Sequence, residues 1–399
     1  MTKAPSIAIV GGGLAGLATA AALNRFGFEA EIFESAMNLR EIGAGINVSP
    51  QAIRVLRAIG LGDWIAAAAN VAPGVLTRDM HSGAPLDYRD QTSAVARFGA
   101  PLCTFHRADL LDVLARGIDS SRLHLGHRLM GIAELRLGVE LSFANGARHR
   151  ADVVIAADGV HSLIRRALYG HNNPTYTGQM VWRALLPSGC VPDDVLEPSG
   201  HIQWLGSRRH FYAYYLRGRD VVNIVTQEDT EQWVEEGWSI PGDPNEMRAS
   251  FPNPEPRLQA LLSAVTQCSK WGLFTRPVTK DWGHNRTQLI GDAAHAMLPN
   301  AGQGAAQAVE DAYILARWLA AMPHDLVKAM ENFRRIRIPR VHAIQRRSSS
   351  IVRSKHRYDP RNGSTSRAKV DAVDAMAWIW GYDPIGDWDK LRLTERPVR

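Results

Sequence analysis

The chain has 399 residues, enough for two or three domains, and its 45% hydrophobic and 22% charged residues are ordinary for a water-soluble globular protein. Its three cysteines, at positions 103, 190 and 268, form no C-x-x-C pair, which argues against a disulfide framework and a cysteine-based metal site. This cysteine usage is typical of a reducing compartment, so we expect a cytoplasmic protein that holds no metal.

The formal net charge of +6 comes from one segment, Asn332 to Tyr358, where nine Lys and Arg residues occur without any Asp or Glu. The rest of the chain therefore carries −3. A basic block can bind nucleic acid, but this one follows a helical segment and has few aromatic residues. We expect a solvated helix face, a subunit contact or a surface that steers anions, and no nucleic-acid partner.

The first segment with a clear pattern is a strand, a glycine-rich turn and a helix. Residues 7–10 are apolar with β-branched members, and residues 14–26 are rich in Ala and Leu. Gly11 permits the tight turn between them, Gly13 lets a phosphate approach the backbone, and Gly16 allows close packing of helix on strand. A second strand, 29–33, ends at Glu34, at the distance where an acid accepts hydrogen bonds from a ribose. This unit predicts a dinucleotide site.

Residues 7–23 are uncharged and could imitate a signal peptide or a membrane span. The glycines within this run and the charged strand directly after it argue against both. We therefore expect no membrane-spanning segment.

The rest of the α/β pattern continues in short elements. We predict a helix from Pro50 to Gly60, strands within 75–88 and at 102–105, a helix that opens at 106–110, and a strand at 139–143. The continuous apolar runs that end at Asp158-Gly159 and at Gly291-Asp292 are typical of buried parallel strands. Helices are expected over 302–321, 326–348 and 372–380, the last after a polar loop at 359–369.

Residues 180–275 have a different pattern, with β-rich pieces at 181–186, 201–205, 211–216 and 221–226. They predict a separate, largely antiparallel sheet. The fold class is therefore α/β, with a Rossmann-like dinucleotide-binding domain (1–75, 101–178 and 276–345), an inserted antiparallel β-sheet domain (76–100 and 179–275), and a C-terminal helical segment (346–399).

Three motifs occur in order: the glycine turn with Glu34, then Asp158-Gly159 with Arg165 and Arg166, then Gly291-Asp292-Ala293-Ala294-His295. With the Arg107 of HRADL and the helix start GQGAAQAVEDA, this order resembles the single-component FAD-dependent aromatic hydroxylases of the para-hydroxybenzoate, salicylate and 6-hydroxynicotinate hydroxylase type. The resemblance covers roughly residues 5–345, and it makes the first domain an FAD-binding domain and the inserted sheet a substrate domain.

The resemblance implies a set of FAD-binding residues: Gly11, Gly13, Leu14, Ala15, Gly16, Glu34, Arg40, Arg107, Leu129, Asp158, Asp292, Gly304 and Ala305. The last two would present N–H groups at a helix start to the flavin, whose reduced form is anionic. No second dinucleotide fingerprint occurs, and the resemblance implies that NADH or NADPH binds only transiently. A plainer interpretation, in which Asp158 and Asp292 are only turn or capping acids, stays open.

The same resemblance implies the substrate-binding residues Asn47, His210, Tyr214, Pro299 and Asn300. His210 is the candidate base, since histidine exchanges protons near neutrality, although a structural hydrogen bond is an equally simple role. Tyr214 falls on the same strand face. Several relatives carry His where this chain has Asn300, and the nicotinate type also has His in place of Asn47. An amide cannot titrate, so proton transfer at position 300 is excluded.

The implied function is a flavin-dependent monooxygenase that hydroxylates a small hydroxylated aromatic or N-heteroaromatic carboxylate with O2 and NAD(P)H, through a C4a-hydroperoxyflavin. Both His210 and Tyr214 would be catalytic. The alternatives are an FAD-dependent oxidase or dehydrogenase on the same fold, and a non-catalytic FAD-binding protein. We expect a monomer or a homodimer.

Overall fold

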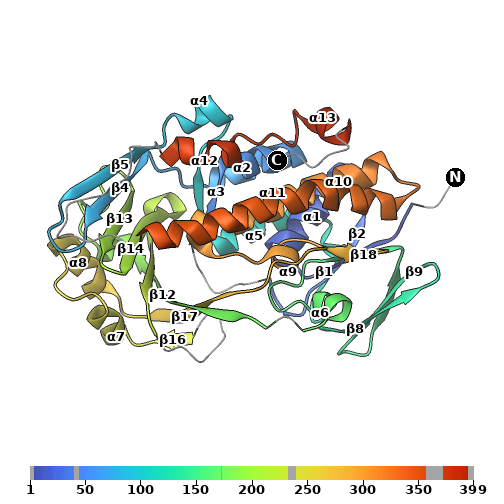
Figure 1. The fold of residues 1–399 in the computed structure, drawn as a ribbon, viewed down its shortest axis with the longest axis horizontal. Coiled ribbons are helices and arrows are strands. Elements are labelled where there is room, and N and C mark those ends of the chain that lie inside the picture. The colour runs from blue at the N-terminus through green and yellow to red at the C-terminus, as the bar shows by residue number, and fades with distance from the viewer. Residues whose placement is uncertain (1–3, 40–44, 172, 232–239, 356–371, 394–399) are drawn as a thin grey trace.

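A computed structural model of the chain describes residues 4–39, 45–171, 173–231, 240–355 and 372–393. A six-stranded and an eight-stranded sheet lie at opposite ends of the molecule (Figure 1). The long helix α11 (Leu326–Lys355) runs between the two ends across the front of this view.

The six-stranded sheet contains the predicted βαβ unit. Its order is β18-β19-β11-β1-β2-β7, and every neighbouring pair is parallel except β18 and β19. Both faces are covered, which explains the continuous apolar composition of β1 and β11, whose residues are all buried. The strands are β1 (Ile7–Val10), β2 (Ala30–Phe33), β7 (Leu123–His124), β11 (Val153–Ala156), β18 (Gly283–His284) and β19 (Thr287–Leu289).

The eight-stranded sheet has the order β16-β17-β12-β15-β14-β13-β4-β5. All its neighbours are antiparallel except β13 and β4. The strands are β4 (Gly74–Asp79), β5 (Pro85–Asp90), β12 (Thr175–Pro187), β13 (His201–Gly206), β14 (Arg209–Leu216), β15 (Val221–Asp229), β16 (Ile240–Gly242) and β17 (Cys268–Thr275).

One face of this sheet carries its hydrophobic core. Trp182, Trp204 and Phe211 are fully buried there, together with apolar residues of α7 (Pro244–Ala249) and α8 (Pro256–Ala264). Each indole N–H is satisfied, by Glu228 at 2.9 Å and by Glu255 at 2.8 Å respectively. The two tryptophans are therefore core residues. Since side chains alternate along a strand, the opposite face is left to form a cavity wall.

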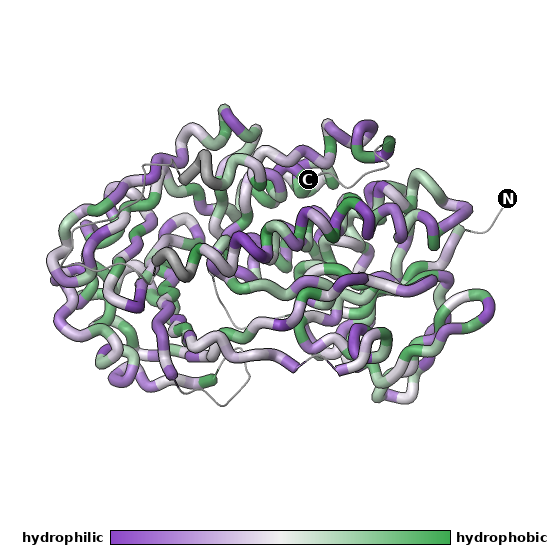
Figure 2. Tube along the Cα trace, viewed as in Figure 1, coloured by the Kyte–Doolittle hydropathy of each residue, from purple (hydrophilic) through white to green (hydrophobic). Residues whose placement is uncertain are grey.

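The remaining strands and helices connect these two sheets. Hydrophobic segments concentrate in the inner helices and strands, whereas hydrophilic and hydrophobic residues alternate along α11 (Figure 2). The elements are β3 (Gly45–Val48), β6 (Cys103–His106), β8 (Leu129–Leu135), β9 (Gly138–Phe143), β10 (Arg148–Ala151), α1 (Leu14–Arg25), α2 (Pro50–Leu56), α3 (Gly62–Ala68), α4 (Ala94–Phe98), α5 (Arg107–Ala115), α6 (Leu163–Tyr169), α9 (Asp292–His295), α10 (Gly304–Ala321), α12 (Ala372–Trp380) and α13 (Trp388–Leu393).

The α/β fold class predicted from the sequence is confirmed, and the division into domains stays a prediction. Two helix ends differ from expectation. α11 continues to Lys355, beyond the predicted end at 348, and Gly60 interrupts a helix that resumes at Gly62. Gly60 adopts φ 90°, a conformation that favours glycine. No helix in the described ranges is both long enough and apolar enough to cross a membrane.

A buried ion-pair network joins α10 to α11. The Arg337 guanidinium donates to Asp311 at 2.8 Å and to Glu310 at 2.5 Å, and Arg340 donates to Glu310 at 2.8 and 3.0 Å. Glu310, Asp311 and Arg337 are 0% exposed. Burial alone would raise the pKa of the Glu310 carboxyl, but the charges of Arg340 and Arg337 outweigh it and hold that pKa below its usual range.

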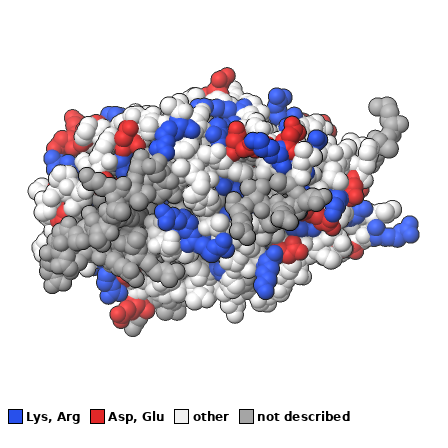
Figure 3. All heavy atoms as spheres, turned by 45° about the horizontal axis from the view of Figure 1, so that its top comes forward, with Lys and Arg blue, Asp and Glu red and all other residues white. Residues whose placement is uncertain are grey.

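The prediction for the basic block was therefore wrong for two of its arginines. Arg337 and Arg340 do not lie on a solvated face, because their acid partners are supplied by a neighbouring helix. On the face shown in Figure 3, basic and acidic side chains are interspersed. The role of the rest of the block stays a prediction.

Replacing Arg337 by Met should lower the free energy of unfolding by about 3–5 kcal/mol, because it removes a buried cation that is hydrogen bonded to both Glu310 and Asp311. Lys328→Met is the matched control, since Lys328 lies on the same helix in an exposed pair with Glu331 and should cost about 1 kcal/mol or less. The measurement is urea denaturation at pH 7.

The pH dependence of these variants provides a second test. The pKa values of Glu310 and Asp311 are lowered in the folded state, so the stability they contribute is present at neutral pH and is lost as pH falls through them. The difference in the free energy of unfolding between wild type and Arg337→Met should therefore become smaller below about pH 4. Equal losses in both variants at pH 7 would contradict this account of the network.

Candidate functional site

A cavity of about 1760 Å³ lies where the carboxyl ends of the parallel strands face the eight-stranded sheet. It is lined by residues of all three sequence motifs. The predicted residues that line it are Gly11, Gly13, Leu14, Ala15, Glu34, Asn47, Arg107, Leu129, Asp158, His210, Tyr214, Asp292, Pro299, Asn300, Gly304 and Ala305. Gly16 lies beneath this lining, and Arg40 lies outside the described residues.

The glycine turn after β1 is built for close approach. Gly11 has φ 107°, and a Cβ there would lie 2.3 Å from the Ala157 carbonyl oxygen. A Cβ on Gly16 would lie 1.9 Å from the Gly11 oxygen, so Gly16 serves helix–strand packing. Gly13 has no heavy atom within 4 Å of a Cβ position, which leaves its backbone open to a ligand in the cavity.

Glu34 closes this turn from the second strand. One carboxylate oxygen accepts the Gly12 N–H at 2.6 Å, and the other accepts the Ala36 N–H at 2.7 Å. The side chain thus fixes the glycine backbone and also lines the cavity. Carboxylate oxygens accept more than one hydrogen bond, so the predicted contact with a ribose remains compatible with this geometry and stays a prediction.

Arg165 ties the second motif to the third. Its guanidinium donates to the Val160 carbonyl at 2.5 Å, and to the Asp292 and Ala293 carbonyls at 3.2 and 2.9 Å. Arg165 is 5% exposed, and these contacts hold two cavity-lining turns together. The sequence did not indicate this role.

Asp158 is a capping acid that also lines the cavity. Its Oδ2 accepts the Leu163 and Ile164 N–H groups at the start of α6, at 2.9 and 3.3 Å. Burial raises the pKa of this carboxyl. Asp158 is therefore a capping acid, as the plainer interpretation had it. Its predicted contact with a cofactor stays a prediction.

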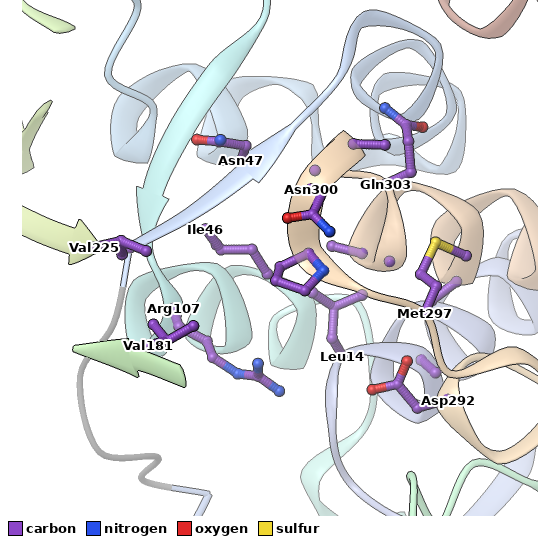
Figure 4. A pocket seen from close by; sticks show the side chains of 18 of the residues that line it. Leu14, Ile46, Asn47, Arg107, Val181, Val225, Asp292, Met297, Asn300 and Gln303 are labelled. Atoms are coloured by element: carbon purple, nitrogen blue, oxygen red, sulfur yellow. The ribbon is translucent and has the colours of Figure 1, made fainter. Parts of the chain in front are cut away.

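Asp292 begins α9, and its carboxylate is exposed to the cavity. Asp311 of α10 fixes the turn before Asp292. It accepts the Gly291 N–H at 3.0 Å and is hydrogen bonded to His295 at 2.6 Å. In Figure 4 the carboxylate of Asp292 and the guanidinium of Arg107 point into the cavity from opposite sides, with Leu14 between them.

The opposite wall of the cavity is the open face of the eight-stranded sheet. Residues paired across neighbouring strands form rows on this face: Arg183, Val225, Tyr212, Gln203 and Thr77 make one row, Tyr214 and His201 belong to a second, and Gln227, His210 and Leu205 to a third. His210 and Tyr214 line the same cavity, as their shared strand face predicted. The catalytic roles proposed for them are not decided by position.

The hydroxyl of Tyr214 is buried against the backbone of β3. A Cβ on Gly45 would lie 2.4 Å from it, so only glycine fits there, and the Gly45 N–H donates to Asn223 at 2.8 Å. Burial raises the pKa of Tyr214 to about 12. Tyr214 therefore stays protonated at neutral pH and can donate a hydrogen bond.

Several buried polar atoms around the cavity indicate a polar ligand. Asn47 Oδ1, Gln203 Nε2 and Asn300 Nδ2 have no hydrogen-bond partner within the described part of the chain, and all three residues line the cavity. Each such buried atom costs about 1–3 kcal/mol unless a ligand or water satisfies it. Together with the open backbone at Gly13 and Gly304, they fit FAD and a polar substrate.

Sequence reasoning missed part of the sheet wall. Arg183, His201 and Gln203 line the cavity without having been singled out. The signal was present, because each is a polar residue inside an apolar strand and shares the parity that faces the cavity. Which parity faces the cavity becomes known only once the strands are paired.

The variant Gly13→Asp tests FAD binding separately from the stability of the fold. An added Cβ has no heavy atom within 4 Å, so the melting temperature of the apoprotein should change little. FAD affinity should fall at least about 100-fold because a carboxylate opposes the pyrophosphate. Gly16→Ala should instead lower the melting temperature. Circular dichroism melting and FAD titration measure the two effects. FAD binding by Gly13→Asp at wild-type affinity would refute the cofactor site.

Comparisons with known proteins agree with this geometry. A family model described as FAD binding domain matches residues 4–347. The chain is 34% identical over 388 residues to a 3-amino-4-hydroxybenzoate 2-monooxygenase of Streptomyces platensis, covering 96% of this chain and 98% of that protein. It is 36% identical over 329 residues to a 6-hydroxynicotinate 3-monooxygenase of Bordetella bronchiseptica, covering 79% of this chain and 83% of that protein.

A solved salicylate hydroxylase substrate complex shares the fold, with a TM-score of 0.83 and 25% identity, and covers 100% of both chains. The family, the cofactor FAD and the enzyme class predicted from the three motifs are confirmed. The chain therefore belongs to the family of single-component, FAD-dependent aromatic hydroxylases and is a flavoprotein monooxygenase.

Proposed function

We propose that this chain hydroxylates a small hydroxylated aromatic or N-heteroaromatic carboxylate, using O2 and NADH or NADPH. One observation carries the proposal. Arg183, His210 and Tyr214 line the sheet wall of the cavity beside apolar side chains, and the glycine turn and the start of α10 line the same cavity from the other side. Relatives named for such acids, 3-amino-4-hydroxybenzoate and 6-hydroxynicotinate, support it.

The cofactor side of the cavity suits FAD. Gly11, Gly13 and the start of α1 would hold the pyrophosphate with backbone N–H groups, and Arg107 and Asp292 would hold neighbouring polar parts of the cofactor. The N-terminus of α10, an 18-residue helix that begins at Gly304, would stabilise negative charge on the reduced flavin. When bound, FAD supplies the activation of O2 and the transfer of one oxygen atom to the ring.

The substrate side suits an aromatic acid. Val181, Val225 and Trp271 give the cavity an apolar surface for a ring. Arg183 lies in the row of Val225, and its guanidinium is 4.6 Å from the centre of the Trp271 ring, which restrains it. An arginine fork recognises a carboxylate through two parallel hydrogen bonds, so we assign Arg183 to the carboxylate.

His210 and Tyr214 are assigned to the ring hydroxyl. An electron-rich ring is most simply obtained by removing the hydroxyl proton. Two histidines, His201 and His210, lie on this wall, and we assign the proton to His210. Tyr214 remains protonated because its pKa is raised to about 12, so it would donate a hydrogen bond and position the ring. Hydroxylation is then directed ortho or para to the existing hydroxyl.

The amides at 47 and 300 would position the substrate or flavin by hydrogen bonds, since neither can exchange a proton. A cytoplasmic location and a monomeric or homodimeric state complete the proposal. Free cysteines at 103, 190 and 268 support a reducing compartment.

The first test is a screen of NADH and NADPH oxidation by purified holoenzyme with hydroxylated benzoates and nicotinates and their carboxamides. Acids should accelerate oxidation many-fold over the basal rate, whereas carboxamides should not. Arg183→Met should weaken binding of the acid by roughly 10- to 150-fold, the value of a hydrogen bond to a charged group. If no acid accelerates oxidation or gains oxygen, an oxidase or a non-catalytic protein becomes the better assignment.

The second test concerns the proton. His210→Ala should slow hydroxylation by roughly 100- to 10,000-fold, as loss of a general base does, and should divert reductant to hydrogen peroxide with FAD binding unchanged. Tyr214→Phe should weaken substrate binding but leave the pH dependence of kcat/KM below pH 10 unaltered, because Tyr214 does not ionise there. Wild-type coupling and rate in both variants would remove these two residues from the reaction.

A further inference from the structure

The cavity has a third wall that comes from the C-terminal part of the chain. Met376, Trp378 and Trp380 of α12 line it, together with Arg347 and Ile351 of α11. The sequence assigned no role to this segment beyond helix. Figure 1 shows α12 near α2 and α4, far along the chain from the motifs that line the same cavity.

Two arginines hold the end of α12 in place. From α2, Arg54 donates to the Trp380 and Tyr382 carbonyls at 3.4 and 2.5 Å, and Arg340 of α11 donates to the Ile379 carbonyl at 3.1 Å. Carbonyls at a helix end have no partner within the helix, so the two cations satisfy them and match the negative end of the helix dipole. The position of α12 is thereby fixed against the core.

Apolar contacts connect α12 to the loop that carries predicted site residues. Trp380 meets the ring of Phe98 edge-on with 5.8 Å between ring centres, in a buried cluster with Ile379. Met297 and Met376 pack against this cluster. Met297 lies between Asp292 and Pro299 and lines the cavity, as Figure 4 shows.

Trp378 occupies the mouth of the cavity. Its side chain lines the cavity although the residue is 46% exposed, so it contacts both the interior and the solvent. Arg347 lines the same cavity from α11. An indole and a guanidinium that line one cavity suit an aromatic anion.

We propose that Met376 and Trp378 of α12 determine the size of ring that the enzyme accepts and keep water from the reacting site. The proposal rests on the proposed function, since the ring is taken to be a small aromatic acid. Oxygen transfer to a substrate competes with loss of hydrogen peroxide, and exclusion of water favours transfer. A wall that closes over the ring would therefore govern both the size of ring that is accepted and the fraction of reductant that is used for hydroxylation.

The test uses holoenzyme carrying Trp378→Ala or Met376→Ala, with Trp64→Ala as matched control. Trp64 is also an exposed tryptophan, 48% exposed, and it stacks under Arg116 away from the cavity. For a monocyclic hydroxybenzoate, the Kd from calorimetry should rise about 2- to 10-fold in Trp378→Ala, as loss of an aromatic contact predicts. The fraction of reductant lost as hydrogen peroxide should rise, and a hydroxynaphthoate should gain relative affinity.

FAD content should stay at the wild-type level in all three variants. Unchanged Kd, coupling and ring preference in Trp378→Ala and Met376→Ala, beside a wild type that hydroxylates the benzoate, would overturn the role of α12 alone. Failure of the wild type to bind or hydroxylate any acid would sink the proposed function instead.

Iodide quenching of the flavin fluorescence provides a readout that needs no substrate. The quenching constant should rise at least about twofold in Trp378→Ala and stay constant in Trp64→Ala, because only the first opens the cavity to a solute. Equal constants in the two variants would also overturn the role of α12.

Discussion

The buried pairing of Glu310 and Asp311 with Arg337 and Arg340 is the interaction on which the other parts of the site depend. Taking these charges out of water costs several kcal/mol per ion, and only complete pairing compensates. The same groups reach outward on two sides, since Asp311 accepts the Gly291 N–H before Asp292 and Arg340 donates to the carbonyl of Ile379. The network thus sets the cofactor turn and the C-terminal wall relative to one another.

The cavity combines two kinds of wall, which differ in their physical origin. One wall consists largely of backbone groups, from glycine turns, strand ends and the starts of α1 and α10. This arrangement suits a large, anionic cofactor that is bound by shape and N–H groups. The other wall consists of side chains on one face of the eight-stranded sheet, and the hydrophobic core of this sheet lies on the opposite face. In the proposed function, the residues that select the substrate are thus separate from those that bind FAD.

What the sequence could predict follows this distinction. The turn from Gly11 to Gly16 is local, so its glycines, the flanking strand and helix, and Glu34 together predicted a dinucleotide site. The parity of His210 and Tyr214 on one strand was sufficient to place both on one face. Arg183 and Gln203 were not predicted as cavity residues, because their position depends on pairing between strands that are distant in the sequence. Arg337 and Arg340 were misinterpreted because their acid partners lie in another helix, and nothing local to α12 indicated that it lines a cavity.

The central claim, that oxygen from O2 is added to a hydroxylated aromatic acid, is tested most directly by turnover under isotopically labelled dioxygen. Mass spectrometry of the product formed by holoenzyme with NAD(P)H and an accelerating acid should show one labelled oxygen atom per product molecule, on a carbon ortho or para to the existing hydroxyl. Reductant consumption with unlabelled or unchanged acid, and hydrogen peroxide as the oxygen product, would contradict the claim and identify an oxidase.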